Sequence, residues 1–136
     1  MTDKELIDLA KEAAGNAYVP YSHYTVGAAL LSKSGKVYTG CNIENAAYGP
    51  TNCAERTAFF KAISEGEREF SKIAVVGGKE LNFADYFAPC GVCRQVMREF
   101  CEDDFMILLG KNGDEYKSIT LAELLPLSFS KSNISE

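Results

Sequence analysis

The first apolar residues of the chain recur every three or four positions, which is the spacing of one face of an α-helix. Thr2 stands before them with Glu5 three residues later, and such a pair is typical of a capping box at the start of a helix. The spacing predicts a helix over residues 3–16 whose apolar side covers one face of a sheet. The pattern consists of Leu6, Leu9, Ala10, Ala13 and Ala17.

Five shorter runs of apolar, β-branched and aromatic residues predict β-strands further along the chain. The turn pairs Ser34–Gly35 and Asn112–Gly113 separate the first two and the last two runs, so both of these pairs are expected to form hairpins. The predicted strands are residues 25–31 (TVGAALL), 36–42 (KVYTGCN), 72–77 (KIAVVG), 105–110 (FMILLG) and 115–120 (EYKSIT).

Two further helices are predicted over residues 53–65 and 90–101, and each begins at a cysteine. The segments 43–52 and 78–88 lack periodicity and are expected to be loops, while LAELL at 121–125 predicts a short last helix. The element order α-β-β-α-β-α-β-β-α predicts an α/β protein with a three-layer α/β/α fold around a mixed five-stranded sheet. We expect one domain, residues 1–136, with a frayed tail from about residue 130.

Composition and charge narrow the classes of function. The chain has 136 residues, 46% of them hydrophobic, which is enough to bury one core. Its net charge of -5 argues against a nucleic-acid polymer as partner, because such binding needs clustered Lys and Arg. The start of the chain mixes charges into every turn, and no apolar span of about 20 residues is present. We therefore expect a cytoplasmic protein that does not enter a membrane.

The five cysteines favour metal binding or thiol chemistry over disulfides, because their number is odd and the expected compartment is reducing. His23 is the one histidine, which excludes sites that need two or three imidazoles from one chain. Cys53, Cys90 and Cys93 lie at the starts of two predicted helices. Three thiolates around one tetrahedral ion leave the fourth position open, as in a catalytic zinc site.

Other uses of the cysteines stay open at this point. Cys41 could close the site as a fourth ligand, or it could be a small buried hydrophobe. Cys101 is excluded as a ligand, because eight residues beyond Cys93 on one helix place it about 12 Å further along. Cys90 and Cys93 could also form a dithiol redox pair at a helix start, but that alternative leaves Cys53 without a use.

Glu55 stands two residues after Cys53, where it can face the same cavity without binding the ion. A carboxylate beside a metal-activated water can take its proton and deliver it elsewhere. Alone, an acidic residue in a first turn is ordinary helix chemistry. Together with Pro-Cys-x-x-Cys at residues 89–93, however, Cys-Ala-Glu at residues 53–55 resembles the motif of the zinc-dependent deaminases.

The chain resembles the homotetrameric zinc-dependent cytidine deaminases over nearly its whole length. The resemblance implies one Zn²⁺ per subunit, proton transfer by Glu55, and hydrolytic deamination of cytidine and 2′-deoxycytidine to uridine and 2′-deoxyuridine plus ammonia, in pyrimidine nucleoside salvage. It also implies a homotetramer whose subunits share active sites. The matching segments are Tyr21-Ser22 with TVGAALL, GCNIENAAY, CAERTA, PCGVCRQV and ELLP.

The same resemblance implies how a nucleoside is held. Asn42 and Glu44 would hydrogen-bond the 3′-hydroxyl of the sugar, and because a carboxylate repels a phosphate, free nucleosides are favoured over nucleotides. Tyr24 would pack against the pyrimidine, and the backbone N–H of Ala54 would bind the carbonyl of the base. The residues that would reach the site of a neighbouring subunit are Ala46, Tyr48 and Phe129.

Three thiolates and one Zn²⁺ leave a net negative charge, which weakens the pull of the metal on its water. Two helix N-termini and a guanidinium are expected to offset it, and the resemblance favours Arg56 as the donor to a ligand sulfur. Arg94 could have the same role or could be a solvated surface residue. His23 is expected to lie at the surface or to pack against other side chains. The connection from Gly77 to Pro89 has no assigned role.

Two alternatives to cytidine deamination remain. One is a deaminase of another aminopyrimidine, such as blasticidin S. The other is a non-catalytic zinc or redox module. The preference for ribose over deoxyribose is not fixed by any of these residues.

Overall fold

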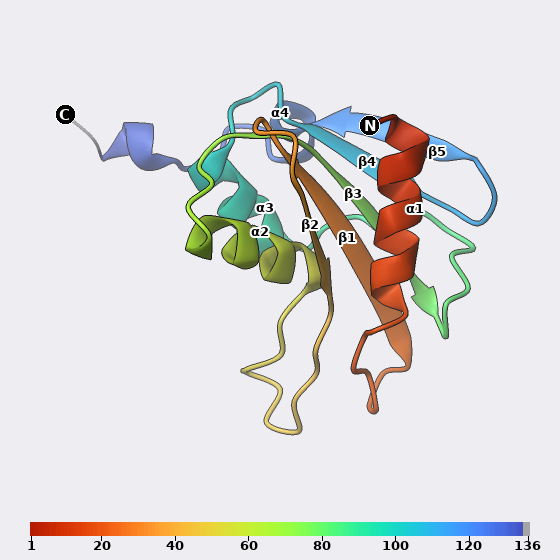
Figure 1. Ribbon diagram of the computed structural model, residues 1–136. Helices are drawn as coiled ribbons and strands as arrows, with labels where there is room; N and C mark the ends of the chain where they lie inside the picture. Colours follow the sequence, from red (N-terminus) through yellow and green to blue (C-terminus); the bar gives the residue numbers. More distant parts are fainter. Residues whose placement is uncertain (135–136) are drawn as a thin grey trace.

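The computed structural model describes residues 1–134 and places a five-stranded sheet between two layers of helices (Figure 1). The predicted three-layer α/β fold with a mixed sheet is confirmed. The elements are α1 (Asp3–Ala14), β1 (Tyr24–Ser32), β2 (Val37–Cys41), α2 (Ala54–Ser64), β3 (Phe70–Lys79), α3 (Gly91–Phe100), β4 (Met106–Gly110), β5 (Tyr116–Thr120), α4 (Leu121–Leu124) and the 3₁₀ turn η1 (Lys131–Asn133).

The strand order is β2-β1-β3-β4-β5, and the pairing brings several chain segments to one end of the sheet. β1 is antiparallel to β2 and to β3, so the start of β1 lies beside the ends of both: Tyr24 pairs with Lys79, and Gly27 pairs with Cys41. β3 and β4 are parallel, which requires a crossover connection, and α3 forms part of it. The loops that leave β2 and β3 at this end lead into α2 and α3.

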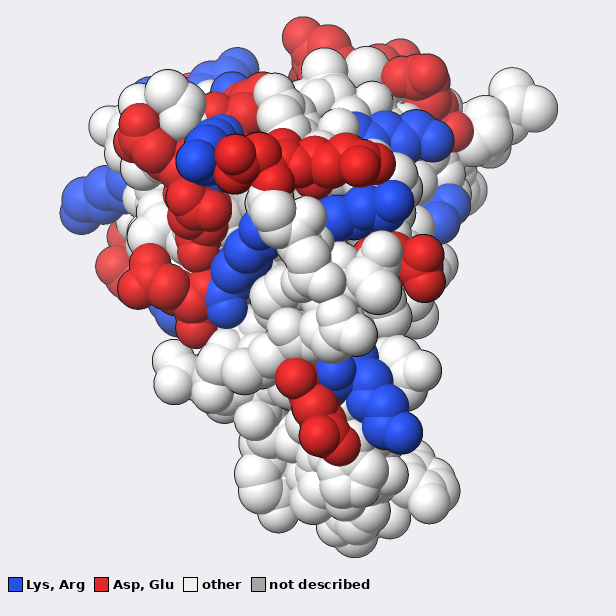
Figure 2. Space-filling view, turned by 90° about the vertical axis from the view of Figure 1, so that its right-hand side faces the viewer, with Lys and Arg blue, Asp and Glu red and all other residues white. Residues whose placement is uncertain are grey.

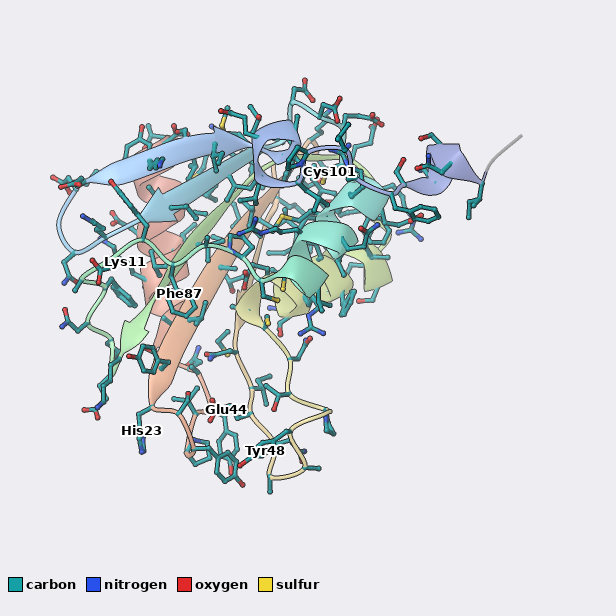
Figure 3. The ribbon with its side chains drawn as sticks, turned by 180° about the vertical axis from the view of Figure 1, so that it is seen from behind. Lys11, His23, Glu44, Tyr48, Phe87 and Cys101 are labelled. Atoms are coloured by element: carbon teal, nitrogen blue, oxygen red, sulfur yellow. The ribbon has the colours of Figure 1, made fainter. Side chains whose placement is uncertain are left out.

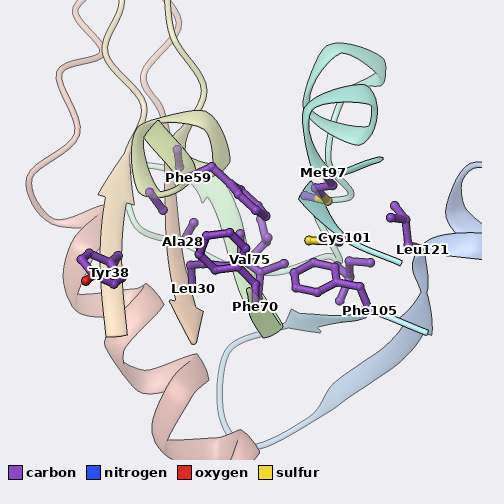
Figure 4. Close-up of a cluster of buried hydrophobic side chains, with 14 of the residues drawn as sticks. Ala28, Leu30, Tyr38, Phe59, Phe70, Val75, Met97, Cys101, Phe105 and Leu121 are labelled. Carbon is purple, nitrogen blue, oxygen red and sulfur yellow. The ribbon is translucent and has the colours of Figure 1, made fainter. Parts of the chain in front are cut away.

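Each face of the sheet has its own apolar core. α1 covers one face, where Leu6 and Ala10 pack among buried residues of β1, β3 and β4. α2, α3 and α4 cover the other face, around Phe59 (Figure 4). The Phe59 ring lies 5.2 Å from the Phe70 ring and 6.1 Å from the Phe105 ring. Truncating such a buried aromatic costs about 3–5 kcal/mol, so Phe59 fixes α2 on the sheet.

Gly40 sets how closely the first turn of α2 approaches the sheet. A Cβ atom at Gly40 would lie 2.4 Å from the carbonyl oxygen of Ala54 and 2.7 Å from the backbone nitrogen of Ala58. Those distances are far below van der Waals contact, so a larger residue would push α2 away from β2. The absence of a side chain at Gly40 therefore determines where the residues at the start of α2 lie.

The predicted elements are all present, with shifts at their ends. The first helix ends at Ala14 rather than at residue 16, and β3 continues to Lys79 because its last residues pair with β1. Cys53 and Cys90 are the N-caps of α2 and α3 rather than their first helical residues. Residues 131–133 form a 3₁₀ turn, and the frayed tail from about residue 130 stays a prediction.

The surface carries no single-sign charge field on the face drawn in Figure 2, where Lys and Arg alternate with Asp and Glu. Two ion pairs are Lys72–Asp3 at 2.6 Å and Lys4–Asp114 at 3.2 Å. Within residues 1–134, every helix is too short or too polar to span a bilayer.

Candidate metal centre

Three cysteine side chains meet where the N-terminal ends of α2 and α3 come together. Cys53 caps α2, Cys90 caps α3, and Cys93 lies in the first turn of α3. Both capping residues have extended backbone angles, which turn the chain from loop into helix at the cysteine itself. Since helix N-termini carry partial positive charge, the two helices place their favourable ends at the sulfur atoms.

The spacing of the sulfur atoms fits a tetrahedral zinc ion. The Sγ atoms of Cys53 and Cys90 are 3.7 Å apart, and those of Cys90 and Cys93 are 3.6 Å apart. All three lie within 4.8 Å of one another. A Zn–S bond of about 2.3 Å with tetrahedral angles separates two ligand sulfurs by about 3.8 Å. The three thiols are therefore already arranged as zinc ligands.

The other two cysteines lie outside this cluster. In the described part of the chain, the group of potential ligands contains three cysteines and includes neither Cys41 nor Cys101. Cys101 is buried at the opposite end of α3 (Figure 3), as the rise per helical residue predicts. Burial raises the pKa of Cys101 to about 12 and also raises that of Cys41. This geometry does not favour the closed four-cysteine alternative.

The pKa values of two thiols in the cluster, those of Cys53 and Cys93, are shifted in opposite directions. A hydrogen bond with Cys93 is the main cause that lowers the pKa of Cys53 to about 5, and Arg56 lowers it further against the opposing effect of burial. The pKa of Cys93 is raised, because its thiol proton is shared with Cys53 and because it is buried. Cys53 is thus the thiolate of this pair at neutral pH, and binding a metal must displace the proton of Cys93.

Arg56 contacts the thiolate that carries this charge. Its Nη2 atom donates a hydrogen bond to Cys53 Sγ at 3.3 Å, and this bond is the main cause that raises the pKa of Arg56. Arg56 stands three residues after Cys53 on α2, so one helical turn brings the two side chains to the same face. The contact is the one expected of a charge-balancing guanidinium.

Glu55 lies beside the thiols and is almost inaccessible to solvent. Only 4% of its surface is exposed. Burial is the main cause that raises its pKa to about 7, and the charge on Cys53 raises it as well. A carboxyl group with a pKa near 7 is available in both protonation states at neutral pH, which is the requirement for a general acid and base.

Glu55, Cys53 and Cys90 line a cavity of about 250 Å³, here called the metal pocket. Two larger hollows, of about 470 and 450 Å³, lie near the C-terminal end of α3, away from the cysteine cluster. The metal pocket is lined by Ser22, Tyr24, Val26, Asn42, Thr51, Asn52, Cys53, Ala54, Glu55, Phe87, Ala88 and Cys90.

The amide of Asn42 is held in this wall by the backbone of β1. Its Oδ1 accepts from the N–H of Val26 and its Nδ2 donates to the carbonyl of Tyr24, each at 2.9 Å. Asn42 stands directly after β2 and continues the pairing with β1 through its side chain. The orientation of the amide is therefore fixed without a substrate, and Nδ2 retains a second hydrogen to donate.

Glu44 lies next to the metal pocket rather than in its wall. Its Oε1 accepts from the backbone N–H groups of Tyr21 and Ser22 at 3.1 Å, and hydrogen bonding to Ser22 lowers its pKa. Glu44 lines an adjoining hollow with Tyr21 and Tyr48, and Ser22 lines both cavities. The predicted pair of sugar-binding residues is thus split between two neighbouring cavities that share Ser22 as a wall.

Phe87 is a lining residue that the sequence did not single out. It lies in the connection from Gly77 to Pro89, and its ring centroid is 6.4 Å from that of Tyr24, with a tilt of 30° (Figure 3). The ring rests over Gly77, where a Cβ atom would approach Phe87 Cγ to 2.5 Å. The connection therefore does line the pocket, and Tyr24 and Phe87 form one aromatic wall.

The residues expected to reach a neighbouring subunit are exposed and do not line the metal pocket of their own chain. Tyr48 is 75% exposed in the loop between β2 and α2 (Figure 3), and Ala46 is exposed in the same loop. Phe129 is 61% exposed, and its carbonyl accepts from Gln95 of α3 at 2.8 Å. His23 is also exposed, as expected, with a φ of 63°.

Comparisons with known proteins extend over the whole chain. Residues 1–109 match the family described as "Cytidine and deoxycytidylate deaminase zinc-binding region". The cytidine deaminase of Sporosarcina psychrophila is 50% identical over 135 residues, 99% of this chain and 96% of that protein. That of Halalkalibacterium halodurans is 49% identical over 136 residues, all of both chains. The crystal structure of cytidine deaminase from Burkholderia pseudomallei has a TM-score of 0.87 at 46% identity and covers 95% of this chain and 100% of its own.

Proposed function

This chain belongs to the cytidine deaminase family, and we propose that it catalyses the zinc-dependent hydrolytic deamination of cytidine and 2′-deoxycytidine to uridine and 2′-deoxyuridine, with release of ammonia. The observation that carries the proposal is the shared cavity: two of the three thiols with zinc-ligand spacing, those of Cys53 and Cys90, border one pocket of about 250 Å³ together with a buried carboxyl of raised pKa and a fixed amide.

Cys53, Cys90 and Cys93 are the residues that would hold the zinc ion. When bound, the ion would act as a Lewis acid that lowers the pKa of a water molecule, so that its deprotonated form would be available as the nucleophile near neutral pH. Three protein ligands leave one position for that water. Arg56 and the two helix N-termini offset the negative charge of the thiolates.

Glu55 performs the proton transfers. Hydrolytic deamination takes both protons from one water molecule: the first goes to a ring nitrogen when the water oxygen adds to the carbon, and the second goes to the departing ammonia when the carbonyl forms. A carboxyl with a pKa near 7 can accept the first proton and donate it again without a large energetic cost. Its burial keeps bulk water from exchanging that proton during the transfer.

The substrate is held by groups around the cavity. The N–H of Ala54 belongs to the first turn of α2, where backbone donors have no helical partner, and it binds the carbonyl of the base. Tyr24 and Phe87 flank the pyrimidine. Asn42 and Glu44 bind the sugar hydroxyl, and the negative charge of Glu44 disfavours a nucleotide phosphate.

The assembly is a homotetramer that completes each site with residues from a neighbour. Support for this comes from Tyr48 and Phe129, which are large and exposed and do not line the metal pocket of their own chain. A further apolar hollow between α2 and α3, lined by Phe60, Val92 and Val96, gives a surface for contact between subunits. Sedimentation equilibrium of the purified protein tests the stoichiometry. In the cell, the enzyme acts in the cytoplasm in pyrimidine nucleoside salvage.

The activity is tested by the loss of ultraviolet absorbance at the cytidine maximum. Cytidine and 2′-deoxycytidine are expected to react, while cytidine monophosphate and blasticidin S react at least about 100-fold more slowly, since a site lacking complementary groups loses several kcal/mol of binding. Zinc analysis after dialysis is expected to give one ion per chain. Zinc binding without turnover of cytidine would instead identify a non-catalytic zinc module. Faster turnover of blasticidin S than of cytidine would identify a deaminase of that other aminopyrimidine.

A further inference from the structure

Arg94 directly follows the ligand Cys93, but its guanidinium does not contact a sulfur atom. Its Nε donates to the carbonyl of Pro89 and its Nη1 donates to the carbonyl of Leu124, both at 2.8 Å. Pro89 is the residue before the ligand Cys90, and Leu124 is the last residue of α4. One side chain therefore joins the backbone before a metal ligand to an element about 30 residues further along the chain.

The backbone that Arg94 holds has little other support. Among the described residues, positions 84–89 make no backbone-to-backbone hydrogen bond, and the contact with Arg94 is the one side-chain hydrogen bond to their backbone. Pro89 has no N–H to donate, and it is fully buried. A buried carbonyl without a partner costs about 1–3 kcal/mol. The position of Cys90 thus depends on a segment whose backbone is fixed mainly through Arg94.

The other end of the bridge is rigid. Thr120 is the N-cap of α4, and its side chain and that of Glu123 form a capping box. The N–H of Leu121 donates to the carbonyl of Phe105 at 2.9 Å. Leu121 and Leu124 are buried in the core beneath α2 and α3. The last carbonyls of a helix lack intrahelical partners, so that of Leu124 is free to accept. α4 can therefore serve as a fixed support.

We propose that Arg94 is a positioning residue of the metal centre, which braces the turn carrying Cys90 against α4. It acts on the metal through the backbone, whereas Arg56 contacts a ligand sulfur directly. Only a planar guanidinium has donors that diverge toward two separate carbonyls; a lysine ammonium on a flexible stem reaches one of them at a time. The proposal rests on the proposed zinc centre and is independent of which pyrimidine is deaminated.

The test compares zinc affinity in Arg94→Met with that in a matched control, Arg68→Met. Arg68 also bonds two backbone carbonyls through its guanidinium, those of Ile63 and Glu67 at 2.9 and 2.8 Å, but at the far end of α2 from the cysteines. Zinc-loaded protein is titrated with a chromophoric chelator at 25 °C. We expect zinc affinity to fall about 10–100-fold in Arg94→Met, the usual effect of losing an outer-shell partner, and to stay within about twofold in Arg68→Met.

Thermal unfolding of the zinc-free proteins measures general stabilisation separately from zinc affinity, and Arg94→Met is expected to lose more stability than Arg68→Met, because the hydrogen bonds of Arg94 are partly buried whereas those of Arg68 are exposed. Arg94→Lys, which keeps the charge, is expected to be intermediate in zinc affinity and replaces Arg94→Met if that variant does not fold. Wild-type zinc affinity in the Arg94 variants, or an equal loss in Arg68→Met, overturns the proposal. Zinc-binding protein that fails to deaminate cytidine overturns the proposed function and leaves this comparison valid.

Discussion

Replacing Gly77 with alanine tests how the aromatic wall of the metal pocket is held. The new Cβ would lie 2.5 Å from Cγ, 2.6 Å from Cδ1 and 2.9 Å from Cβ of Phe87. Ordinary carbon contacts lie at about 3.5–4.0 Å, so the side chain must move by about 1 Å or more. Because the position of Phe87 Cβ is fixed by its backbone, a change of rotamer cannot relieve the contact with that atom, and the chain around Phe87 must move as well.

The expected cost follows from the overlap. Overpacking of this kind costs about 1–3 kcal/mol. With an unfolding entropy of about 2.1 cal/mol/K per residue and 136 residues, the melting temperature is expected to fall by about 4–10 °C. Moving Phe87 also removes its proposed aromatic contact with the pyrimidine of the substrate. Such a contact is worth about 0.5–1.5 kcal/mol, so KM for cytidine should rise about 2–10-fold.

Differential scanning calorimetry, zinc analysis and steady-state kinetics measure these effects. Zinc content should stay at one per chain, since Gly77 does not contact a ligand. Gly49→Ala is the control, because the nearest atom to its new Cβ lies 4.0 Å away, and its melting temperature should stay within about 2 °C of wild type. In a Phe87→Ala background, the penalty of Gly77→Ala should shrink by at least about 1 kcal/mol. Equal penalties in both backgrounds would show that Phe87 is not the contact responsible.

Further predictions concern the cysteine cluster and its neighbours. Glu55→Gln should retain one zinc per chain while kcat falls at least about 100-fold, because an amide cannot carry the proton; normal turnover would reject this role. Arg56→Ala should keep the fold, measured by circular dichroism, but lose turnover or zinc, and full activity with unchanged metal content would contradict it. Removing zinc with a chelator should lower the melting temperature and adding zinc back should restore it, because the ion binds the folded state. In zinc-free protein at pH 7, peptide mapping should find Cys53 alkylated by iodoacetamide well before Cys101. The reason is that the pKa of Cys53, about 5, lies below that pH, whereas the pKa of Cys101, about 12, lies above it. Equal rates of alkylation would contradict the assignment of Cys53 as the thiolate.

The elements that could be predicted are those specified by local chemistry. The hairpin turns at Ser34–Gly35 and Asn112–Gly113 connect antiparallel strands as expected, and Gly35 and Gly113 have the positive φ angles that such turns require. The four extra residues of β3, two at each end, could not be predicted, because Phe70, Gly78 and Lys79 extend the strand by pairing with β1, far away in the sequence. The order of the five strands depends on the same long-range pairing.

The candidate site divides in the same way. Cys53, Cys90 and Cys93 could be found from their spacing at two helix starts, and Glu55 from its place after Cys53. Phe87 could not, because its position over Gly77 depends on how residues 80–88 fold back across the end of β3. Exposed aromatics in such a connection would give the same sequence pattern.

The two arginines show why spacing alone does not assign a role. Arg56 stands three residues after Cys53, and Arg94 stands four residues after Cys90, so helical geometry brings either side chain within reach of a ligand sulfur. Arg56 contacts its sulfur, whereas Arg94 donates to two carbonyls. One of those carbonyls lies before α3 and the other at the end of α4, so only the folded chain brings them together. In the fold, the guanidinium of Arg94 hydrogen-bonds these two carbonyls instead of making a second contact to the thiolates. Charge balance at the sulfur atoms therefore depends on Arg56 and the helix N-termini. The geometry of the turn at Cys90 depends on Arg94.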